Sequence, residues 1–365
     1  MRRCNETFEP PFCPNPDCPY HHRTTGWRYK KIGFYRRRWA PRLVQRYLCL
    51  HCRRSCSTQT FQSTYWLKRP DLLGTIFKRV LSCSSYRQIA RELKVAHSTI
   101  QRQTERLGRH CLLFQQQFRS RAKLREPLVA DGFETFEYSQ YHPCHFNLAV
   151  GAESQFFYAF TDAELRRKGR MTDYQKRRRA WLETEDGRPD PKAIEKEFAE
   201  LLRLVPVESG RLELRTDDHR AYPRALRRLP HLEVDHRITS SKERRDSRNQ
   251  LFAVNWLDLL IRHGSSNHKR ETIAFSKCRQ NAAEKLSILQ VWRNFIKPMT
   301  EKGQGDPPAV LLGLVDRALE VVDVLKRRLF PSRVVLPERL AIYYRRETVT
   351  RRLPRQRHHQ LTYAQ

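Results

Sequence analysis

The sequence contains no long run of apolar residues. Its first eleven residues, M-R-R-C-N-E-T-F-E-P-P, have no apolar core of signal-peptide length. No later stretch approaches the roughly 20 consecutive apolar residues that a membrane-spanning helix requires. We therefore expect a cytoplasmic protein that has no membrane partner.

Acidic residues are scarce relative to basic ones. The 365 residues include 39 Asp and Glu against 71 Lys and Arg, so the formal net charge is +32. Such an excess would repel itself without a counter-charge, and it favours a polyanionic partner such as nucleic acid. Within the cytoplasm this predicts association with the nucleoid. Hydrophobic residues still make up 39% of the chain, which is enough for packed cores and for a multidomain protein of this length.

Cysteines are not distributed as a disulfide scaffold would require. The chain has ten of them, five between Cys13 and Cys56 and the others scattered singly. Disulfide frameworks are typical of short secreted chains, which this is not. Metal binding therefore explains the cluster better.

Two closely spaced cysteine pairs predict a zinc ribbon over residues 1–65. Two pairs of this kind can bring four thiolates into a tetrahedron around Zn2+. The expected ligands are Cys13, Cys18, Cys49 and Cys52. Three nearby residues could replace one of them: Cys4, His51 and Cys56. Between the pairs, K-K-I-G-F-Y-R-R-R-W alternates basic and aromatic residues, which suits a hairpin that faces phosphates.

Residues 66–120 show helical periodicity. Ser85 and Gln88 have the spacing of a capping box, and after a short K-V-A-H turn Ile100 and Leu107 would face inward. This pattern predicts a helix-turn-helix domain, with a plain three-helix bundle as the alternative. The second helix would leave outward five side chains suited to phosphates and base edges: Ser98, Thr99, Gln101, Arg102 and Arg106.

Residues 125–300 have the pattern of one α/β domain. V-A-D-G-F-E-T-F, H-F-N-L-A-V-G-A and F-F-Y-A-F-T-D-A predict three strands in an antiparallel meander. A basic insertion follows over residues 165–206, which we interpret as a DNA-facing segment; a solvated helix is the alternative. L-E-L-R-T then resumes the sheet, and L-E-V-D-H-R-I-T is a further strand.

Two of these strands are expected to end in an aspartate. P-L-V-A-D delivers Asp131, and L-E-L-R-T-D delivers Asp217. Two strands that each present a carboxylate can hold Mg2+ or Mn2+ between them, because hard cations favour oxygen ligands. The alternative is that both residues simply cap a strand or begin a turn.

The last segment, residues 301–365, follows the polar loop K-G-Q-G-D-P-P. The run A-V-L-L-G-L-V-D-R-A-L-E-V-V-D-V-L-K-R-R-L-F predicts one long helix, and a basic tail follows it. Packing or oligomerisation would use the helix, and DNA backbone contact would use the tail.

This order of segments resembles the bacterial insertion-sequence transposases of the acidic-triad (DDE-type) class, whose catalytic domain is ribonuclease H-like. T-D-D-H-R-A-Y is similar to the family's T-D-x-x-x-x-Y, which selects Asp217 rather than Asp218. R-E-T-I-A-F-S-K, residues 270–277, is similar to the R-K-T-I-x-F-S-K tail that follows the third acid in one branch. The resemblance covers residues 1 to about 300.

The third catalytic acid departs from the family pattern. Counting back from that tail, the position of the family's glutamate is Asn255 and that of its asparagine is Asp258. Residues i and i+3 share a helix face, so either the Asp258 carboxylate or the Asn255 amide oxygen could reach the same metal. Asp258 could instead pair with Arg262. Glu271 and Glu284 are more remote candidates.

The resemblance implies an enzyme that uses two divalent metal ions for phosphoryl transfer. It would bind the terminal repeats of an element as double-stranded DNA, cut them and join them to target DNA as a homo-oligomer. Two alternatives remain: a regulator that binds DNA through the zinc ribbon and helix-turn-helix without chemistry, and a structure-specific nuclease on the same fold.

Overall fold

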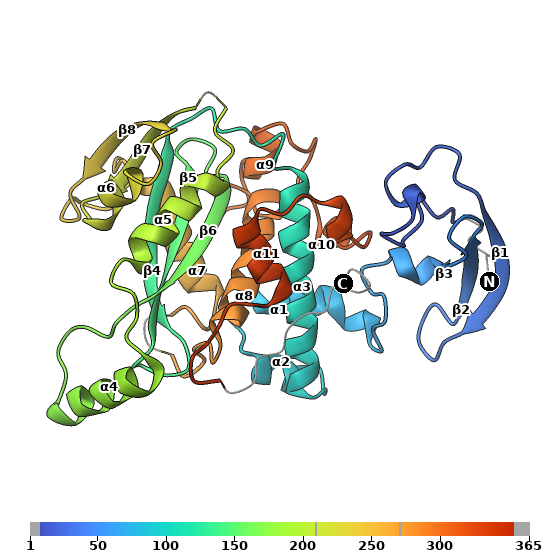
Figure 1. The fold of residues 1–365 in the computed structure, drawn as a ribbon, viewed down its shortest axis with the longest axis horizontal. Coiled ribbons are helices and arrows are strands. Elements are labelled where there is room, and N and C mark those ends of the chain that lie inside the picture. Colours follow the sequence, from blue (N-terminus) through green and yellow to red (C-terminus); the bar gives the residue numbers. More distant parts are fainter. Residues whose placement is uncertain (1–7, 209, 270–271, 354–365) are drawn as a thin grey trace.

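The computed structural model describes residues 8–208, 210–269 and 272–353. A small three-stranded sheet lies at one end of the molecule, and a larger α/β body forms the rest (Figure 1). Among the helices in the described ranges, none is both long enough and apolar enough to cross a membrane.

The small sheet has the order β1-β2-β3 and is antiparallel throughout. Its strands are β1 (Tyr29–Arg36), β2 (Leu43–Cys49) and β3 (Ser55–Ser57), and the 3-10 turns η1 (Pro19–His21) and η2 (Thr58–Phe61) flank them. Its own small core contains Tyr47, Cys56 and Phe61 together with Phe330 from the far end of the chain. The last segment therefore helps to attach this sheet to the body.

A helical segment follows, with η3 (Pro70–Leu72), α1 (Leu73–Val80), α2 (Tyr86–Glu92) and α3 (His97–Gln117). The predicted capping box is confirmed, because the Ser85 backbone N–H donates to the Gln88 side chain at 2.7 Å and the Gln88 backbone N–H donates to Ser85 Oγ at 3.4 Å. The expected inward positions Ile100 and Leu107 are fully buried.

The helical segment and the sheet share one hydrophobic core, which runs from Leu72 to Tyr344. Helix α3 packs along α8 (Arg279–Val291), and the two backbones approach closely at Gly108. A Cβ atom at Gly108 would lie 2.8 Å from the Glu284 Cα. Residues of the expected 66–120 and 125–300 segments thus contribute to the same core.

The large sheet is mixed and has the order β6-β5-β4-β7-β8. Its strands are β4 (Leu128–Phe136), β5 (Pro143–Gly151), β6 (Phe157–Glu164), β7 (Arg211–Asp217) and β8 (Glu233–Thr239). The antiparallel meander is confirmed for β4, β5 and β6, while β7 and β8 run parallel to β4.

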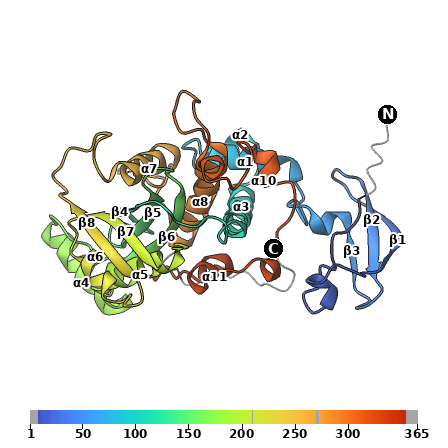
Figure 2. The same cartoon turned by 90° about the horizontal axis from the view of Figure 1, so that it is seen from above.

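Helices cover both faces of this sheet (Figure 2). On one face lie α5 (Ala193–Leu204) and α6 (Ala221–Leu226), and α5 is tied to β6 by the Thr161 hydroxyl, which donates to the Glu197 carbonyl at 2.7 Å. On the other face lie α7 (Phe252–Gly264), α8 with its π-helical end η4 (Trp292–Ile296), and α11 (Glu338–Arg345). Tyr343 of α11 stacks on Phe160 of β6 with ring centroids 5.4 Å apart.

Only part of the predicted basic insertion 165–206 is exposed. Helix α4 (Asp173–Asp186) projects from the body and buries only Leu182 (Figure 1). Helix α5 instead buries Phe198 and Leu201 against the sheet, so it belongs to the core.

The prediction of one long helix near residues 309–330 is wrong. The structure has two short helices there, α9 (Pro308–Leu311) and α10 (Val321–Val324), followed by the 3-10 turn η5 (Pro331–Arg333). Gly313 has φ +63°, a left-handed conformation that ends the first helix. The segment then wraps over α3, where His110 Nε2 donates to the Val324 carbonyl at 2.8 Å. Residues 354–365 of the expected basic tail lie outside the described residues.

Candidate functional site

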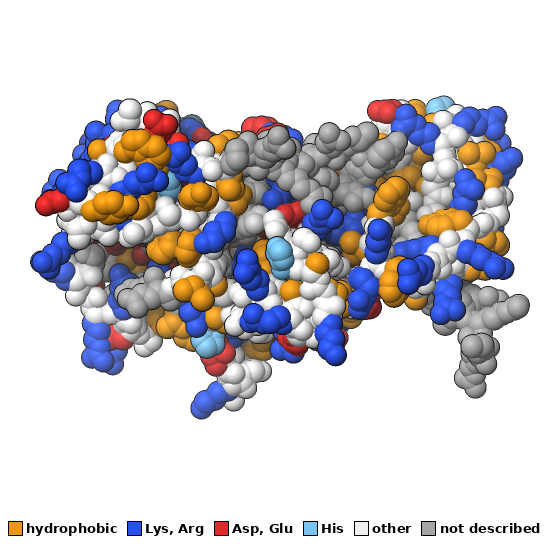
Figure 3. Space-filling view, turned by 90° about the horizontal axis from the view of Figure 1, so that it is seen from below, with side chains coloured by type: hydrophobic (Ala, Val, Ile, Leu, Met, Phe, Trp, Pro, Cys, Tyr) orange, Lys and Arg blue, Asp and Glu red, His pale blue; other side chains and the backbone are white. Residues whose placement is uncertain are grey.

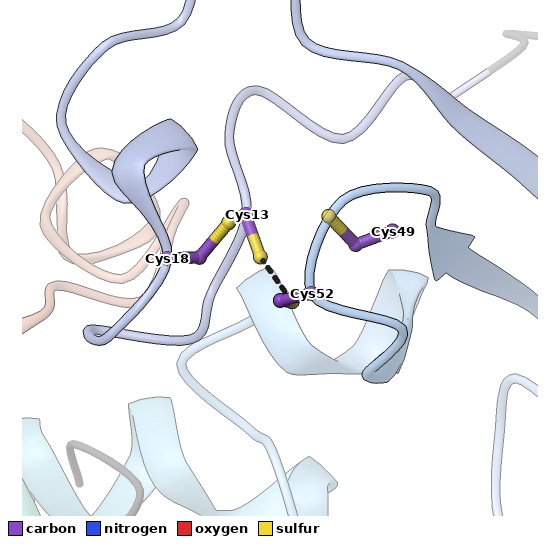
Figure 4. A group of neighbouring side chains, drawn as sticks. All are labelled: Cys13, Cys18, Cys49 and Cys52. Carbon is purple, nitrogen blue, oxygen red and sulfur yellow. Dashed lines mark hydrogen bonds between the residues drawn. The ribbon is translucent and has the colours of Figure 1, made fainter.

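The four predicted zinc ligands come together. The sulfur atoms of Cys13, Cys18, Cys49 and Cys52 all lie within 4.8 Å of one another (Figure 4). Cys18 immediately precedes η1, Cys49 ends β2, and Cys52 lies in the turn before β3. Two loops that are far apart in sequence thus supply two thiols each.

The chemistry of this group fits Zn2+. The Cys13 and Cys52 sulfurs are 3.6 Å apart, close to the ~3.8 Å expected for two ligands in a tetrahedron with Zn–S bonds of about 2.3 Å. The indole N–H of Trp27 donates to Cys49 Sγ at 3.2 Å. Burial raises the pKa of Cys49, but this bond and the backbone N–H groups of Cys52 and His51 outweigh burial and lower the pKa to about 7. Donors that stabilise a thiolate are what a zinc site needs.

The alternative ligands are not in this group. Cys56 packs with Tyr47 and Phe61 in the small core, and His51 is exposed with its ring against Tyr20. Cys4 lies outside the described residues.

The sequence did not single out His21, which is buried beside the cysteines. Its Nδ1 donates to the Cys13 carbonyl at 2.8 Å, and its Nε2 is 2.6 Å from the Ser332 hydroxyl. His21 thus connects the cysteine site to the C-terminal segment, a contact that no local pattern could reveal.

Asp131 and Asp217 occupy matching positions on adjacent parallel strands. The β4–β7 ladder pairs Leu128 with Leu214 and Val129 with Arg215. Two residues further along the same register, Asp131 and Asp217 stand opposite one another. Burial, followed by the negative charge of Asp217, raises the pKa of Asp131 to about 6. The two carboxylates are thus close enough to interact electrostatically.

The expectation that Asp131 ends its strand is wrong, because β4 continues to Phe136. Beyond Val129, however, β4 pairs with β5 and no longer with β7. Asp131 therefore stands where β4 and β7 separate, and Asp217 is the last residue of β7. The two carboxylates thus lie where the β4–β7 pairing has ended, and not both at the end of a strand.

Tyr222 on α6 contacts the first of these carboxylates. Its hydroxyl donates to Asp131 Oδ1 at 3.2 Å, and the Gly132 backbone N–H donates to the same oxygen at 2.7 Å. The Tyr222 ring packs on Phe198 with centroids 4.2 Å apart. Burial, then the charges of Asp131 and Asp217, raise the pKa of Tyr222, so it stays a neutral donor.

Asp217 and Asp218 have different surroundings. Asp217 Oδ1 accepts the backbone N–H of His219 at 2.9 Å. Asp218 Oδ2 accepts the Ser241 hydroxyl at 3.3 Å and so holds the loop between β8 and α7. Arg245 of that loop lies near enough to counteract the rise in the pKa of Asp131.

No third carboxylate joins the pair in the part of the chain that the structure describes. There, the four cysteines are the only group of three or more His, Cys, Asp or Glu side chains with ligand atoms within 4.8 Å of one another. Asp258 instead accepts Arg262 Nε at 3.0 and 3.1 Å, and Arg262 Nη1 donates to the His268 carbonyl at 3.1 Å. Asn255 lies one turn earlier on α7 and is half-buried.

The two remote candidates for the third acid were Glu284 and Glu271. Glu284 is buried on α8 and forms an ion pair with Arg346 between α3, α8 and α11. That position belongs to the helical core. Glu271 lies outside the described residues.

The predicted DNA-contacting face of α3 is only partly exposed. Ser98 and Arg102 are exposed, while Thr99 and Gln101 are half-buried and Gln101 donates to Glu105 at 3.0 Å. Arg106 does not face outward as expected: it donates to the Tyr65 carbonyl. Burial and the nearby Arg328 lower the pKa of Arg106 to about 9. The reason is that α3 continues beneath the C-terminal segment, which covers its second half.

Comparison with known proteins does not assign this chain to a family. No family model and no curated protein matches it. Among solved structures, a chain of the simian T-cell lymphotropic virus intasome in complex with PP2A regulatory subunit B56 gamma, determined by cryo-EM, is similar at 14% identity and a TM-score of 0.24. The similarity covers 50% of this chain and 54% of that chain. A likeness this distant carries no argument about function.

Proposed function

We propose that this protein binds double-stranded DNA and catalyses metal-dependent cleavage and joining of phosphodiesters, as transposases do. The observation that carries the proposal is the matched position of Asp131 and Asp217 on adjacent parallel strands, with electrostatic coupling between them. The mixed five-stranded sheet is compatible with the ribonuclease H-like fold that the sequence resemblance implies.

The two aspartates would hold the catalytic cations. Bound Mg2+ or Mn2+ would lower the pKa of an attacking water or 3'-hydroxyl and stabilise the leaving oxygen. Without a cation, two neighbouring carboxylates repel, and Asp131 keeps its proton up to about pH 6. Tyr222 would orient the Asp131 carboxylate through its hydrogen bond to Oδ1, and Oδ2 would then bind the cation.

A third ligand would come from α7. Asn255 would supply its amide oxygen, whereas Asp258 would first have to leave Arg262. Both are candidates. A neutral oxygen is a weaker Mg2+ ligand than a carboxylate, so this site would require a higher metal concentration than a triad of acids.

The zinc ribbon and the helical segment would contact DNA. Ser98, Thr99, Gln101 and Arg102 are the proposed contacts on α3, and the net charge of +32 supplies the general attraction to phosphates. Action at two element ends implies that the protein works as a homo-oligomer on DNA.

The proposal can be tested by a cleavage and strand-transfer assay. Purified protein is incubated with Mg2+ or Mn2+ and labelled duplexes that carry a free 3'-hydroxyl. Nicking and strand transfer should both occur, and Asp131→Asn or Asp217→Asn should abolish both. Asp235→Asn is the matched control, because Asp235 is an exposed β8 residue paired with Arg237. Unchanged activity in either of the first two variants would refute the assignment.

A second candidate, a DNA-binding regulator without chemistry, is favoured by the pairing of Asp258 with Arg262 and by the absence of a third acid among the described residues. It predicts sequence-specific, zinc-dependent DNA binding and no nicking with any metal. Cleavage without joining would instead favour a nuclease.

A further inference from the structure

The tip of the β1–β2 hairpin rests against the chain segment that leads into the helical body. We call residues 36–42 and 64–71 together the junction surface. The Arg37 backbone N–H donates to the Arg42 carbonyl at 2.7 Å, which closes the hairpin. The Arg37 side chain donates from Nη2 to the Leu67 carbonyl at 3.1 Å. Two segments separated by more than twenty residues thus form one continuous surface.

Trp66 stands out on this surface because its side chain is 78% exposed. Its φ is +62°, in the left-handed region that bulky residues rarely adopt. Flanking turns hold this conformation, with Tyr65 N–H donating to the Gln62 carbonyl at 2.9 Å and Leu67 N–H to the Thr64 carbonyl at 3.0 Å. A strained backbone that presents a large apolar ring to solvent is not explained by packing, and such strain is typical of functional positions.

The junction surface is rich in basic residues. At the hairpin tip, the guanidinium groups of Arg38 and Arg69 each lie 5.6 Å from the ring of Trp39. The one acidic residue of the junction surface, Asp71, is paired with Arg69 at 2.7 Å. Four basic side chains are exposed there: Arg36, Arg38, Arg42 and Lys68. In the space-filling view from below, the end of the molecule that holds the small three-stranded sheet shows basic side chains interleaved with hydrophobic ones (Figure 3).

Basic side chains neutralise phosphates, and an exposed indole face stacks on a base. Inside a duplex, neighbouring bases already cover both faces of every base. A base is therefore open to Trp66 on its faces only where it is unpaired, in an overhang or in a single strand. We infer that the junction surface binds unpaired DNA, with Trp66 stacking on a base and Arg38, Arg42 and Lys68 contacting the phosphates beside it.

This inference rests on the proposed function in taking DNA as the ligand, and it adds the class of substrate: DNA that has an unpaired end. Trp181 on α4, which is also exposed, is less available, because Arg178 and Arg352 already lie over its ring at 4.1 and 4.8 Å.

The test compares two labelled substrates by fluorescence anisotropy: a blunt duplex and the same duplex with a single-stranded 3' overhang. The full-length, zinc-loaded protein is used without divalent cations. Wild type should bind the overhang substrate about tenfold more tightly than the blunt duplex, as expected for one stacked base. Trp66→Ala should remove the difference and leave blunt-duplex affinity unchanged.

Two variants serve as controls. Tyr174→Ala removes an aromatic ring of similar exposure, 66%, on α4 and should keep the preference. Trp66→Gly relaxes the left-handed backbone, so it should raise the thermal midpoint while removing the preference. That combination separates a lost contact from a damaged fold.

Equal binding of both substrates by wild type would overturn the inference, and so would a preference that survives Trp66→Ala. Weaker binding of both substrates by Trp66→Ala would mean that the ring acts on duplex DNA, which also overturns it. None of these outcomes contradicts the proposed function. The proposed function fails if wild type binds no DNA or never cleaves it with Mg2+ or Mn2+.

Discussion

The hydroxyl of Tyr222 donates a hydrogen bond to Asp131 over 3.2 Å, although the two residues are 91 positions apart. Tyr222 reaches this carboxylate because α6 begins directly after β7, which ends in Asp217. One tyrosine is thereby held close to both aspartates, and burial together with their charges keeps its own hydroxyl protonated.

Removal of that hydroxyl should weaken metal binding without unfolding the protein. In Tyr222→Phe the ring still packs on Phe198, but Asp131 loses a positioning donor. We expect the Mg2+ concentration for half-maximal activity to rise about tenfold, at the lower end of the cost of losing an outer-shell partner. In wild type the hydrogen bond from Tyr222 lowers the pKa of Asp131. Its loss should raise that pKa, so the acid limb of the pH–activity profile should move to higher pH.

Tyr158→Phe is the matched control for this prediction, since the buried Tyr158 hydroxyl has no hydrogen-bond partner among the described residues. Its metal dependence should equal that of wild type. An unchanged metal dependence in Tyr222→Phe would remove the positioning role.

Neutralising Asp131 should stabilise the metal-free protein and abolish its activity. The pKa of this carboxyl rises from 3.8 to about 6 on folding, so the folded state binds the proton more tightly than the unfolded state. Ionised Asp131 therefore destabilises the fold above pH 6, by about 1–3 kcal/mol. Asp131→Asn should raise the free energy of unfolding by that amount at pH 7, and the gain should disappear as the pH falls to about 4.

Urea denaturation at pH 7 and pH 4 without divalent cations measures this difference. A variant that is less stable than wild type at pH 7 would show that the Asp131 carboxylate is stabilised by its surroundings, contrary to the proposed site.

Loss of a zinc ligand should unfold the ribbon and leave the body intact. The cysteine group and the small aromatic core are separate from the main core. Cys49→Ser should therefore lose bound zinc and weaken DNA binding, while the circular dichroism of the α/β body persists. Cys56→Ser should keep one zinc per chain in elemental analysis. Loss of zinc from Cys56→Ser, with retention in Cys49→Ser, would reverse the ligand assignment.

The third ligand can be identified by changing charge on α7. Asn255→Asp should lower the Mg2+ concentration needed for activity, because it adds a charged oxygen ligand. Asp258→Asn should leave activity within a few-fold of wild type and reduce stability by about 0.3–0.5 kcal/mol, as expected for the loss of an i,i+4 pair with Arg262. If Asp258→Asn abolishes cleavage, Asp258 is the ligand, and its carboxylate must leave Arg262 when it binds the metal.

Local chemistry alone was enough for much of the architecture. The alternation of apolar residues predicted the strands of the meander, and the spacing of Ser85 and Gln88 predicted a helix start. Cysteine spacing predicted a four-thiol group that the structure brings together. These features depend on neighbours a few residues apart, or on a turn geometry that a short motif encodes.

Other features follow only from packing between distant segments. The run near residues 309–330 has a helical composition, but Gly313 ends the first helix. The chain then covers the second half of α3, and the packing around that helix also encloses Arg106. No periodicity within either segment could reveal that contact.

From the sequence by itself come the segments, their order and the residue types able to bind zinc, DNA or a divalent cation. Tertiary structure alone decided which of those residues meet. The β4–β7 register sets Asp131 opposite Asp217, and α6 brings Tyr222 to Asp131. The same packing leaves Asp258 with Arg262 and Trp66 in solvent. The physical reason is that strand register and helix contacts depend on the fit of whole surfaces from distant parts of the chain, which no short stretch encodes.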